Sequence, residues 1–186
     1  MATVELLSED AVPPKVAHLF DAVRQEYGFV PNILRAMAHC PDLLTVFVPL
    51  WGQVYRSPTI GPRLRALAAL GTAKAQDCTY CVAHMTESAR RAGIGEIEIG
   101  AVGSLADERA VFADRDALIL EVADALTRDP DGVTGELRDR LTAEFTPEEM
   151  VNIVLAVGMY NLTSRFLKAL SIDVEAIFTD AAPAPR

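Results

Sequence analysis

The stretch "PRLRALAALGTAKAQDCTYCVAHMTESARRAG" (residues 62–93) joins a run of small, helix-forming residues to a closely spaced pair of cysteines. Its first half is dominated by Ala and Leu, which are strong helix formers. Pro62 suits the first position of a helix, and Gly93 suits the position just after one. The stretch therefore predicts two helices, over residues 62–76 and 79–92. Five residues of the first, Ala66, Ala68, Ala69, Gly71 and Ala73, are small enough for another helix to approach closely.

The rest of the chain carries helical signals and no convincing strand pattern. Gly28 ends an amphipathic segment, and Pro49 should kink the helix that contains it. The run "TPEE" (residues 146–149) is typical of a capping box, with Thr146 as the cap and Glu149 reaching back to it. Together these signals predict an all-α fold of about nine helical segments, over residues 15–27, 32–39, 42–56, 62–76, 79–92, 95–103 (a short helix or a turn), 114–127, 134–144 and 147–170.

The composition agrees with a single helical domain. The 186 residues are 51% hydrophobic, 23% charged and only 6% aromatic, which suits tightly packed helices better than aromatic-rich strands. A chain of this length can bury roughly 70% of its unfolded surface around one core. We predict one domain over residues 1–180 and a disordered tail, "AAPAPR", over residues 181–186.

The net charge and the N-terminal sequence indicate which partners and which cellular compartment to expect. The formal net charge is -9 and no basic stripe is present, which argues against nucleic acid as a partner. The opening "MATVELLSEDAVPP" lacks the build of a signal peptide, and no uninterrupted apolar run approaches the ~20 residues that span a bilayer. We expect a cytoplasmic protein without a membrane partner, in which paired cysteines more often serve metal or redox chemistry than a structural disulfide.

Cys78 and Cys81 are predicted to lie in the first turn of a helix that Asp77 caps. There the unpaired amide groups and the helix dipole stabilise a thiolate, and Cys-X-X-Cys pairs commonly have lowered pKa values. Three residues at ~100° each place the two sulfurs on one face of the helix. His84, one turn further, is within reach of Cys81 as a base or proton shuttle. The pattern fits a dithiol that attacks an oxidant or a disulfide and then closes on itself.

The spacing alone leaves other interpretations open. A structural zinc site needs four ligands, and beyond the pair and His84 the sequence offers only Cys40, His18 and His39, none in a second paired motif. We therefore expect no metal site. His84 could also be an ordinary helical histidine bonded to a backbone carbonyl.

The motif "CTYCVAH" (residues 78–84), followed by "ESARRAG", resembles the carboxymuconolactone decarboxylase and AhpD-like alkylhydroperoxidase superfamily. The stretches "GFVPNILRAMAHCPDLL" and "EEMVNIVLAVGMYNLTSRFLKAL" are similar to its longer members, so the resemblance covers nearly the whole chain. It implies an AhpD-like all-α fold, assembly into trimers or hexamers, and no tightly bound cofactor. It also implies that Cys81 attacks a peroxide, that Cys78 resolves the product as a disulfide and meets the reductant, and that His84 relays protons.

Two positions depart from the pattern of that superfamily. Its relay glutamate lies twelve residues before the first cysteine, where this chain has Ala66. Its histidine usually lies four residues after the second cysteine, where this chain has Met85, with His84 one position earlier. Glu87, three residues beyond His84, is a candidate to hold the imidazole in place of the missing carboxylate.

The leading hypothesis is an enzyme, a thiol-dependent oxidoreductase that reduces a peroxide or exchanges disulfides through Cys78, Cys81 and His84. A cellular dithiol would then re-reduce it. The alternative is a cofactor-free lyase or decarboxylase for a small lactone or carboxylate, with His84 as base and Arg165 as cationic anchor. A third is a non-catalytic oligomer that keeps the fold. Two segments that are apolar on more than one face, Leu64–Ala75 and Met150–Ala169, also predict a homo-oligomer.

Overall fold

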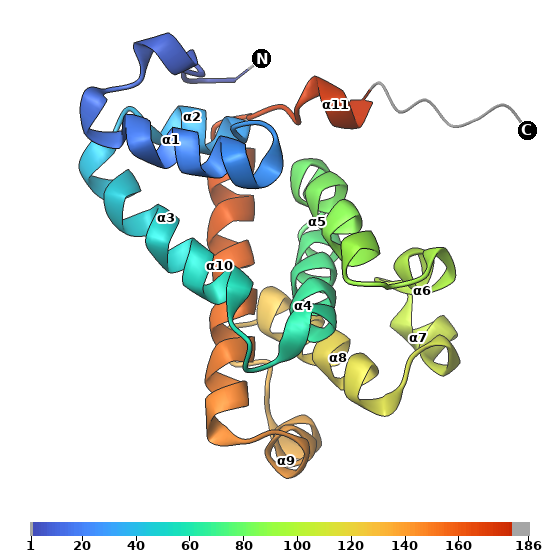
Figure 1. The fold of residues 1–186 in the computed structure, drawn as a ribbon. Coiled ribbons are helices and arrows are strands. Elements are labelled where there is room, and N and C mark those ends of the chain that lie inside the picture. Colours follow the sequence, from blue (N-terminus) through green and yellow to red (C-terminus); the bar gives the residue numbers. More distant parts are fainter. Residues whose placement is uncertain (1, 180–186) are drawn as a thin grey trace, which may run out of the picture. The chain divides into compact units, whose positions relative to one another are not determined.

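The computed structural model describes residues 2–179. Over those residues it contains eleven α-helices, two short 3-10 helices and no strand, so the all-α prediction is confirmed (Figure 1). The α-helices are α1 (Pro14–Tyr27), α2 (Asn32–Met37), α3 (Pro41–Arg56), α4 (Gly61–Ala75), α5 (Thr79–Arg91), α6 (Glu96–Ala101), α7 (Leu105–Glu108), α8 (Asp114–Arg128), α9 (Gly135–Glu144), α10 (Pro147–Ala169) and α11 (Ala176–Thr179). The 3-10 helices are η1 (Glu9–Ala11) and η2 (Arg109–Val111). The predicted disordered tail, residues 181–186, lies outside the described residues.

The nine predicted segments correspond to nine of these helices, with ends that differ by at most two residues. The sequence did not predict α7 and α11, which have four residues each and are too short to display a helical period. Pro49 lies inside α3, which continues through it as one helix. Gly28 ends α1 in the left-handed conformation (φ 82°), as predicted.

The chain forms two compact units. The first comprises the residues up to Gln53 together with those from Arg165 onward. Its hydrophobic core consists of Val12, Val16, Phe20, Val23, Val30, Leu34, Ala38 and Leu44. The side-chain amide of Asn32 donates to the carbonyl of Asp173 (3.0 Å), which fixes the segment after α10 to α2. One domain over residues 1–180 stays a prediction.

The second unit, residues 54–164, is built around α4, which packs against both α5 and α8 (Figure 1). The eight successive residues from Ala66 to Ala73 are all buried. Gly71 lies where α8 comes close: a methyl group added to it would lie 3.1 Å from Cδ2 of Leu120 and 3.3 Å from Cβ of Ala123. The small side chains of this helix therefore allow the close approach that the sequence predicted.

The long helix α10 has a buried and an exposed apolar face. Its buried residues include Ile153, Ala156, Val157, Tyr160, Ser164 and Leu167, and its exposed ones include Val151, Val154, Leu155 and Leu162. The predicted capping box closes its first turn, because the amide of Thr146 donates to the Glu149 carboxylate (2.8 Å) and the amide of Glu149 donates to the Thr146 hydroxyl (3.3 Å).

By length and composition alone, α10 could cross a membrane. An 18-residue window of it has a mean hydropathy of 1.2, and 44% of that window is buried inside the structure. A core helix of a globular protein has the same properties, since it also buries one apolar face. The cytoplasmic location stays a prediction.

Replacement of Gly71 by valine should lower the free energy of unfolding by about 1–3 kcal/mol, because the added methyl groups would overlap α8. Urea unfolding followed by far-UV circular dichroism measures this. Gly100→Val, on α6, is the matched control, since nothing lies within 4 Å of a methyl group added there. It should change the free energy by less than about 0.5 kcal/mol. A Gly71→Val protein as stable as the wild type would show that α4 and α8 are not closely packed.

Candidate functional site

Cys78 lies where α4 ends and α5 begins. Its amide donates to the carbonyl of Ala73 (3.1 Å), and the amide of Asp77 donates to that of Lys74 (3.0 Å), which together form the Schellman arrangement that ends many helices. Asp77 adopts the left-handed conformation of this turn (φ 48°), which Asp tolerates better than most residues. Cys78 is the N-cap of α5, and its sulfur accepts from the amide of Cys81 (3.3 Å). The prediction of Asp77 as the cap is wrong, because the backbone of Asp77 completes the end of α4.

The two cysteines of the motif are brought together in the interior. Their Sγ atoms lie 2.6 Å apart, and both are free thiols. Cys78 is 2% exposed and Cys81 is 4% exposed. Since a disulfide has an S–S distance of about 2.05 Å, a small movement of the two side chains would close one.

The sulfur of Cys81 also lies 3.2 Å from the hydroxyl of Ser164, a fully buried residue of α10. Sequence reasoning did not single out Ser164, because a serine in a helix commonly bonds to the backbone of its own helix. The available signal was its place in "MYNLTSRF", a polar run in an apolar helix. Asn161 of the same run accepts from the Gln76 side chain and donates to the Thr127 hydroxyl (3.0 Å), so this part of α10 is fixed to α8 and to the end of α4.

The surroundings of Cys81 favour its neutral thiol. The hydrogen bond with Cys78, followed by burial, raises the pKa of Cys81 above that of an exposed cysteine, and the hydrogen bond with Ser164 opposes this shift. The prediction of a lowered pKa is therefore wrong for Cys81. The N-terminus of α5 does supply an amide to the pair, but that amide donates to the sulfur of Cys78. At Cys81, the effect of the buried neighbouring thiol on the pKa is larger than that of the helix N-terminus.

His84 is half-buried on α5, one turn after Cys81. Its ring stacks on that of Tyr80, with the centroids 4.5 Å apart and the planes at 11°. Because Tyr80 is buried, this contact holds the imidazole against the helix. The carboxylate of Glu87, the candidate to hold His84, accepts from Arg91 (3.0 Å).

The remaining candidates do not add ligands to the pair. Cys40 is an exposed free thiol, and Arg165 is exposed on α10. Within the described residues 2–179, no group of three His, Cys, Asp or Glu side chains could hold a metal ion.

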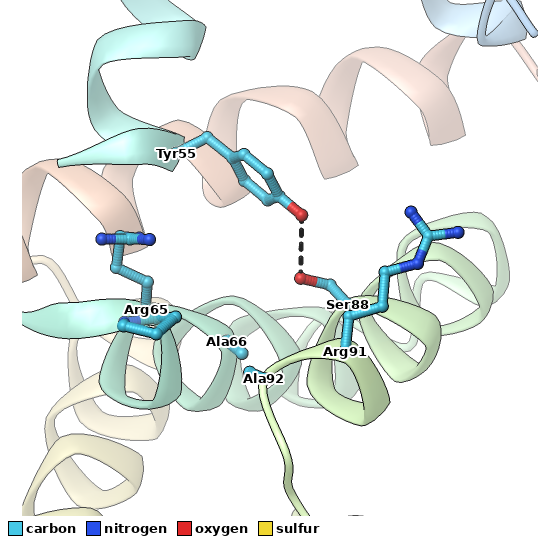
Figure 2. Close-up of a pocket in the computed structure, with 7 residues that line it drawn as sticks. Tyr55, Arg65, Ala66, Ser88, Arg91 and Ala92 are labelled. Carbon is cyan, nitrogen blue, oxygen red and sulfur yellow. Dashed lines mark hydrogen bonds between the residues drawn. The ribbon is translucent and has the colours of Figure 1, made fainter. Parts of the chain in front are cut away.

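A cleft of about 200 Å³ opens between the ends of α3, α4 and α5, all within the second unit. Its lining includes Tyr55, Arg65, Ala66, Ser88, Arg91 and Ala92 (Figure 2). The hydroxyls of Tyr55 and Ser88 are hydrogen-bonded at 2.9 Å. Ala66 contributes a methyl group to the wall of this cleft.

The fold and the cysteine motif define a known class of protein. Residues 41–124 match the carboxymuconolactone decarboxylase family. The chain is 30% identical over 160 residues to the uncharacterized protein YnjA of Escherichia coli (strain K12), which covers 83% of this chain and 85% of the relative. The chain therefore belongs to the carboxymuconolactone decarboxylase family.

Solved structures confirm the AhpD-like fold. An uncharacterized peroxidase-related protein with an alkylhydroperoxidase AhpD core, from Ralstonia eutropha JMP134, has a TM-score of 0.83 at 19% identity and covers 100% of this chain and 98% of its own. A cysteine-to-alanine variant of the debrominase Bmp8, in complex with 2,3,4-tribromopyrrole, has a TM-score of 0.80 at 21% identity and covers 96% of both chains.

Ser164→Ala should raise the pKa of Cys81 further, because the hydroxyl that opposes the upward shift is removed. One hydrogen bond corresponds to roughly half to one pH unit. The measurement is the rate of iodoacetamide alkylation of Cys81 against pH, read by peptide mass. The pH of half-maximal rate should move upward.

Ser88→Ala on α5 is the matched control, since the hydroxyl of Ser88 bonds to Tyr55. It should leave the pH of half-maximal rate unchanged. Looser packing alone would change the alkylation rate of Cys81 by the same factor at every pH and leave the midpoint where it is. An unchanged or lower midpoint in Ser164→Ala would therefore contradict the contact between Ser164 and Cys81.

Proposed function

We propose that this chain is a thiol-dependent oxidoreductase that reduces peroxides, or exchanges disulfides, through Cys78 and Cys81 with the help of His84. The observation that carries the proposal is the 2.6 Å separation of the two free sulfurs at the start of α5. Membership of a family with enzymes of related fold supports it. The substrate is a small molecule, and no bound cofactor is needed.

The reaction with a peroxide proceeds in two steps. The sulfur of Cys81 loses its proton and attacks the terminal oxygen of R–O–O–H, which forms a sulfenic acid and releases the alcohol R–OH. The sulfur of Cys78 then displaces hydroxide from this sulfenic acid, which gives the Cys78–Cys81 disulfide and water. The two thiols are oxidised by two electrons, and the O–O bond receives them.

Proton transfer is the part of this reaction that the site makes difficult. The raised pKa of Cys81 keeps it neutral at pH 7, although the thiolate is the nucleophile. A base must therefore take the proton as attack begins. His84 is the proposed base, since it lies one turn further along α5 and an imidazole can both accept and donate a proton.

A cellular dithiol completes the cycle. It attacks the Cys78–Cys81 disulfide, passes through a mixed disulfide and returns two electrons to the pair. If the physiological oxidant is a disulfide rather than a peroxide, the reduced pair attacks that disulfide through a mixed disulfide. The substrate is then reduced and the Cys78–Cys81 disulfide forms. This chemistry fits a reducing compartment such as the cytoplasm.

A cofactor-free lyase or decarboxylase for a small lactone or carboxylate is the second candidate. The cleft that contains Arg65 and Arg91 favours it, because guanidinium groups bind carboxylates. His84 would be its base, and the cysteines would be dispensable. The debrominase Bmp8 has the same fold and was solved in complex with 2,3,4-tribromopyrrole, so halogenated aromatics are a further class of substrate to test.

The test is to mix the reduced protein with about one equivalent of cumene hydroperoxide and follow the intact mass. Wild type should lose two mass units within the Cys78–Cys81 peptide. Cys81→Ser should lose this reaction completely, whereas Cys40→Ser, which removes the exposed thiol, should retain it. Peroxide consumption that persists in Cys81→Ser would contradict the oxidoreductase, and lactone turnover by the double variant Cys78→Ser/Cys81→Ser would establish the lyase.

We also propose that the chain acts as a homo-oligomer. The middle of α4, from Ala66 to Ala73, is already buried within one chain. On α10, by contrast, Val151, Leu155 and Leu162 recur at helical spacing and are 58%, 50% and 52% exposed. Exposed apolar stripes of this kind mark interaction surfaces.

Sedimentation equilibrium should therefore give the mass of three or six chains. Leu155→Glu should shift the protein to the monomer, because it places a charge in the middle of the stripe. Ile97→Glu makes the same change at another exposed position, on α6, and should leave the oligomer intact. A monomeric wild-type protein would rule out the oligomer.

A further inference from the structure

The cleft between α3, α4 and α5 contains a guanidinium group without an acidic partner. Among residues 2–179, no carboxylate forms an ion pair or hydrogen bond with Arg65. Burial lowers the pKa of Arg65, which means that the protein withdraws water from this charge without replacing it by an anion. The other arginine of the cleft, Arg91, is 63% exposed and bonded to Glu87. Arg65 is thus the group that an anionic ligand would complete.

The rest of the cleft suits a small organic anion. Ala66 and Ala92 leave space where larger side chains would fill it (Figure 2). The bonded hydroxyls of Tyr55 and Ser88 can turn a donor toward a second carboxylate oxygen. A guanidinium and a hydroxyl on an otherwise apolar wall form the usual composition of a site for a carboxylate with a hydrophobic body.

Two helices connect this cleft to the dithiol. On α5, Ser88 lies seven residues after Cys81, which places both on one face, about 10 Å apart along the axis. On α10, Ser164 contacts Cys81, and Tyr160, one turn earlier, is close enough to Arg65 for electrostatic interaction. One turn of four residues spans about 6 Å. Arg65 and Cys81 therefore both lie next to the same turn of α10.

We propose that Arg65 and the hydroxyl pair of Tyr55 and Ser88 bind the carboxylate of the substrate. This inference rests on the proposed function and narrows its substrate class. The substrate is an acidic hydroperoxide or disulfide, whose carboxylate lies in the cleft while Cys81 attacks its O–O or S–S bond. The place of Ala66 supports the assignment, because a glutamate there would put a competing carboxylate into the cleft.

The binding test uses 4-isopropylbenzoate and its neutral analogue 4-isopropylbenzamide as probes, with isothermal titration calorimetry on the reduced protein. Arg65→Gln should weaken benzoate binding about 10- to 100-fold, because one charge-assisted contact is lost. Arg65→Lys should fall between this variant and wild type, since lysine keeps the charge but not the planar fork. Arg90→Gln, a neighbouring arginine bonded to Glu96, is the matched control and should bind like wild type.

Two results would overturn the proposal. One is the absence of benzoate binding to wild type, and the other is equal binding by wild type and Arg65→Gln. The same variants are then tested with 4-carboxycumene hydroperoxide and cumene hydroperoxide. Arg65→Gln should raise KM for the acid about tenfold or more and leave KM for cumene hydroperoxide within about twofold.

The titration also separates this inference from the proposed function. It is repeated on Cys78→Ser/Cys81→Ser, which has no dithiol chemistry. One combination of results is that this variant binds benzoate through Arg65 while the thiols of the wild type resist peroxide. It would support the carboxylate site and reject the oxidoreductase. Oxidation of the wild-type thiols without any Arg65-dependent binding would support the oxidoreductase and reject the carboxylate site.

Discussion

The amide of Cys78 completes the end of α4, while its sulfur accepts the amide of Cys81 and caps the start of α5. One residue therefore serves two helices, and this leaves it little freedom to move. Because α4 is buried between α5 and α8, the turn is held from both sides, and the small residue Gly71 makes that packing possible. The position of the dithiol thus follows from the packing of helices that take no part in the chemistry.

Burial protects the pair and also limits its reactivity. Two sulfurs 2.6 Å apart are ready to form a disulfide, yet the same proximity and the burial of Cys81 favour its neutral thiol. The hydroxyl of Ser164 offsets part of this effect. A site of this kind depends on proton transfer more than on a preformed thiolate, which is why the proposed mechanism assigns a base, His84, to the same helix.

The sequence was sufficient for the nine longer helices and for placing the two cysteines side by side, because both depend on local spacing. The cap at Thr146 and the small face of α4 were predicted for the same reason. Residues brought in from distant parts of the chain were not predictable: Ser164 lies 83 positions from Cys81, and no periodicity indicates which helix α10 will contact. The pKa of Cys81 was predicted in the wrong direction, since local helix electrostatics omit burial and the neighbouring thiol. The cleft with Arg65 depends on three helix ends and leaves no motif in the sequence.

The central claim is that Cys78 and Cys81 form a reversible redox couple. Its most direct test is a titration of the protein against mixtures of reduced and oxidised dithiothreitol, with free thiols counted by intact mass after an acid quench. A working couple predicts one transition that involves two electrons, maps to the Cys78–Cys81 peptide and reverses in reducing buffer. If both thiols remain free in the fully oxidised buffer, the pair is a structural feature of the core, and the chemistry of this protein lies elsewhere.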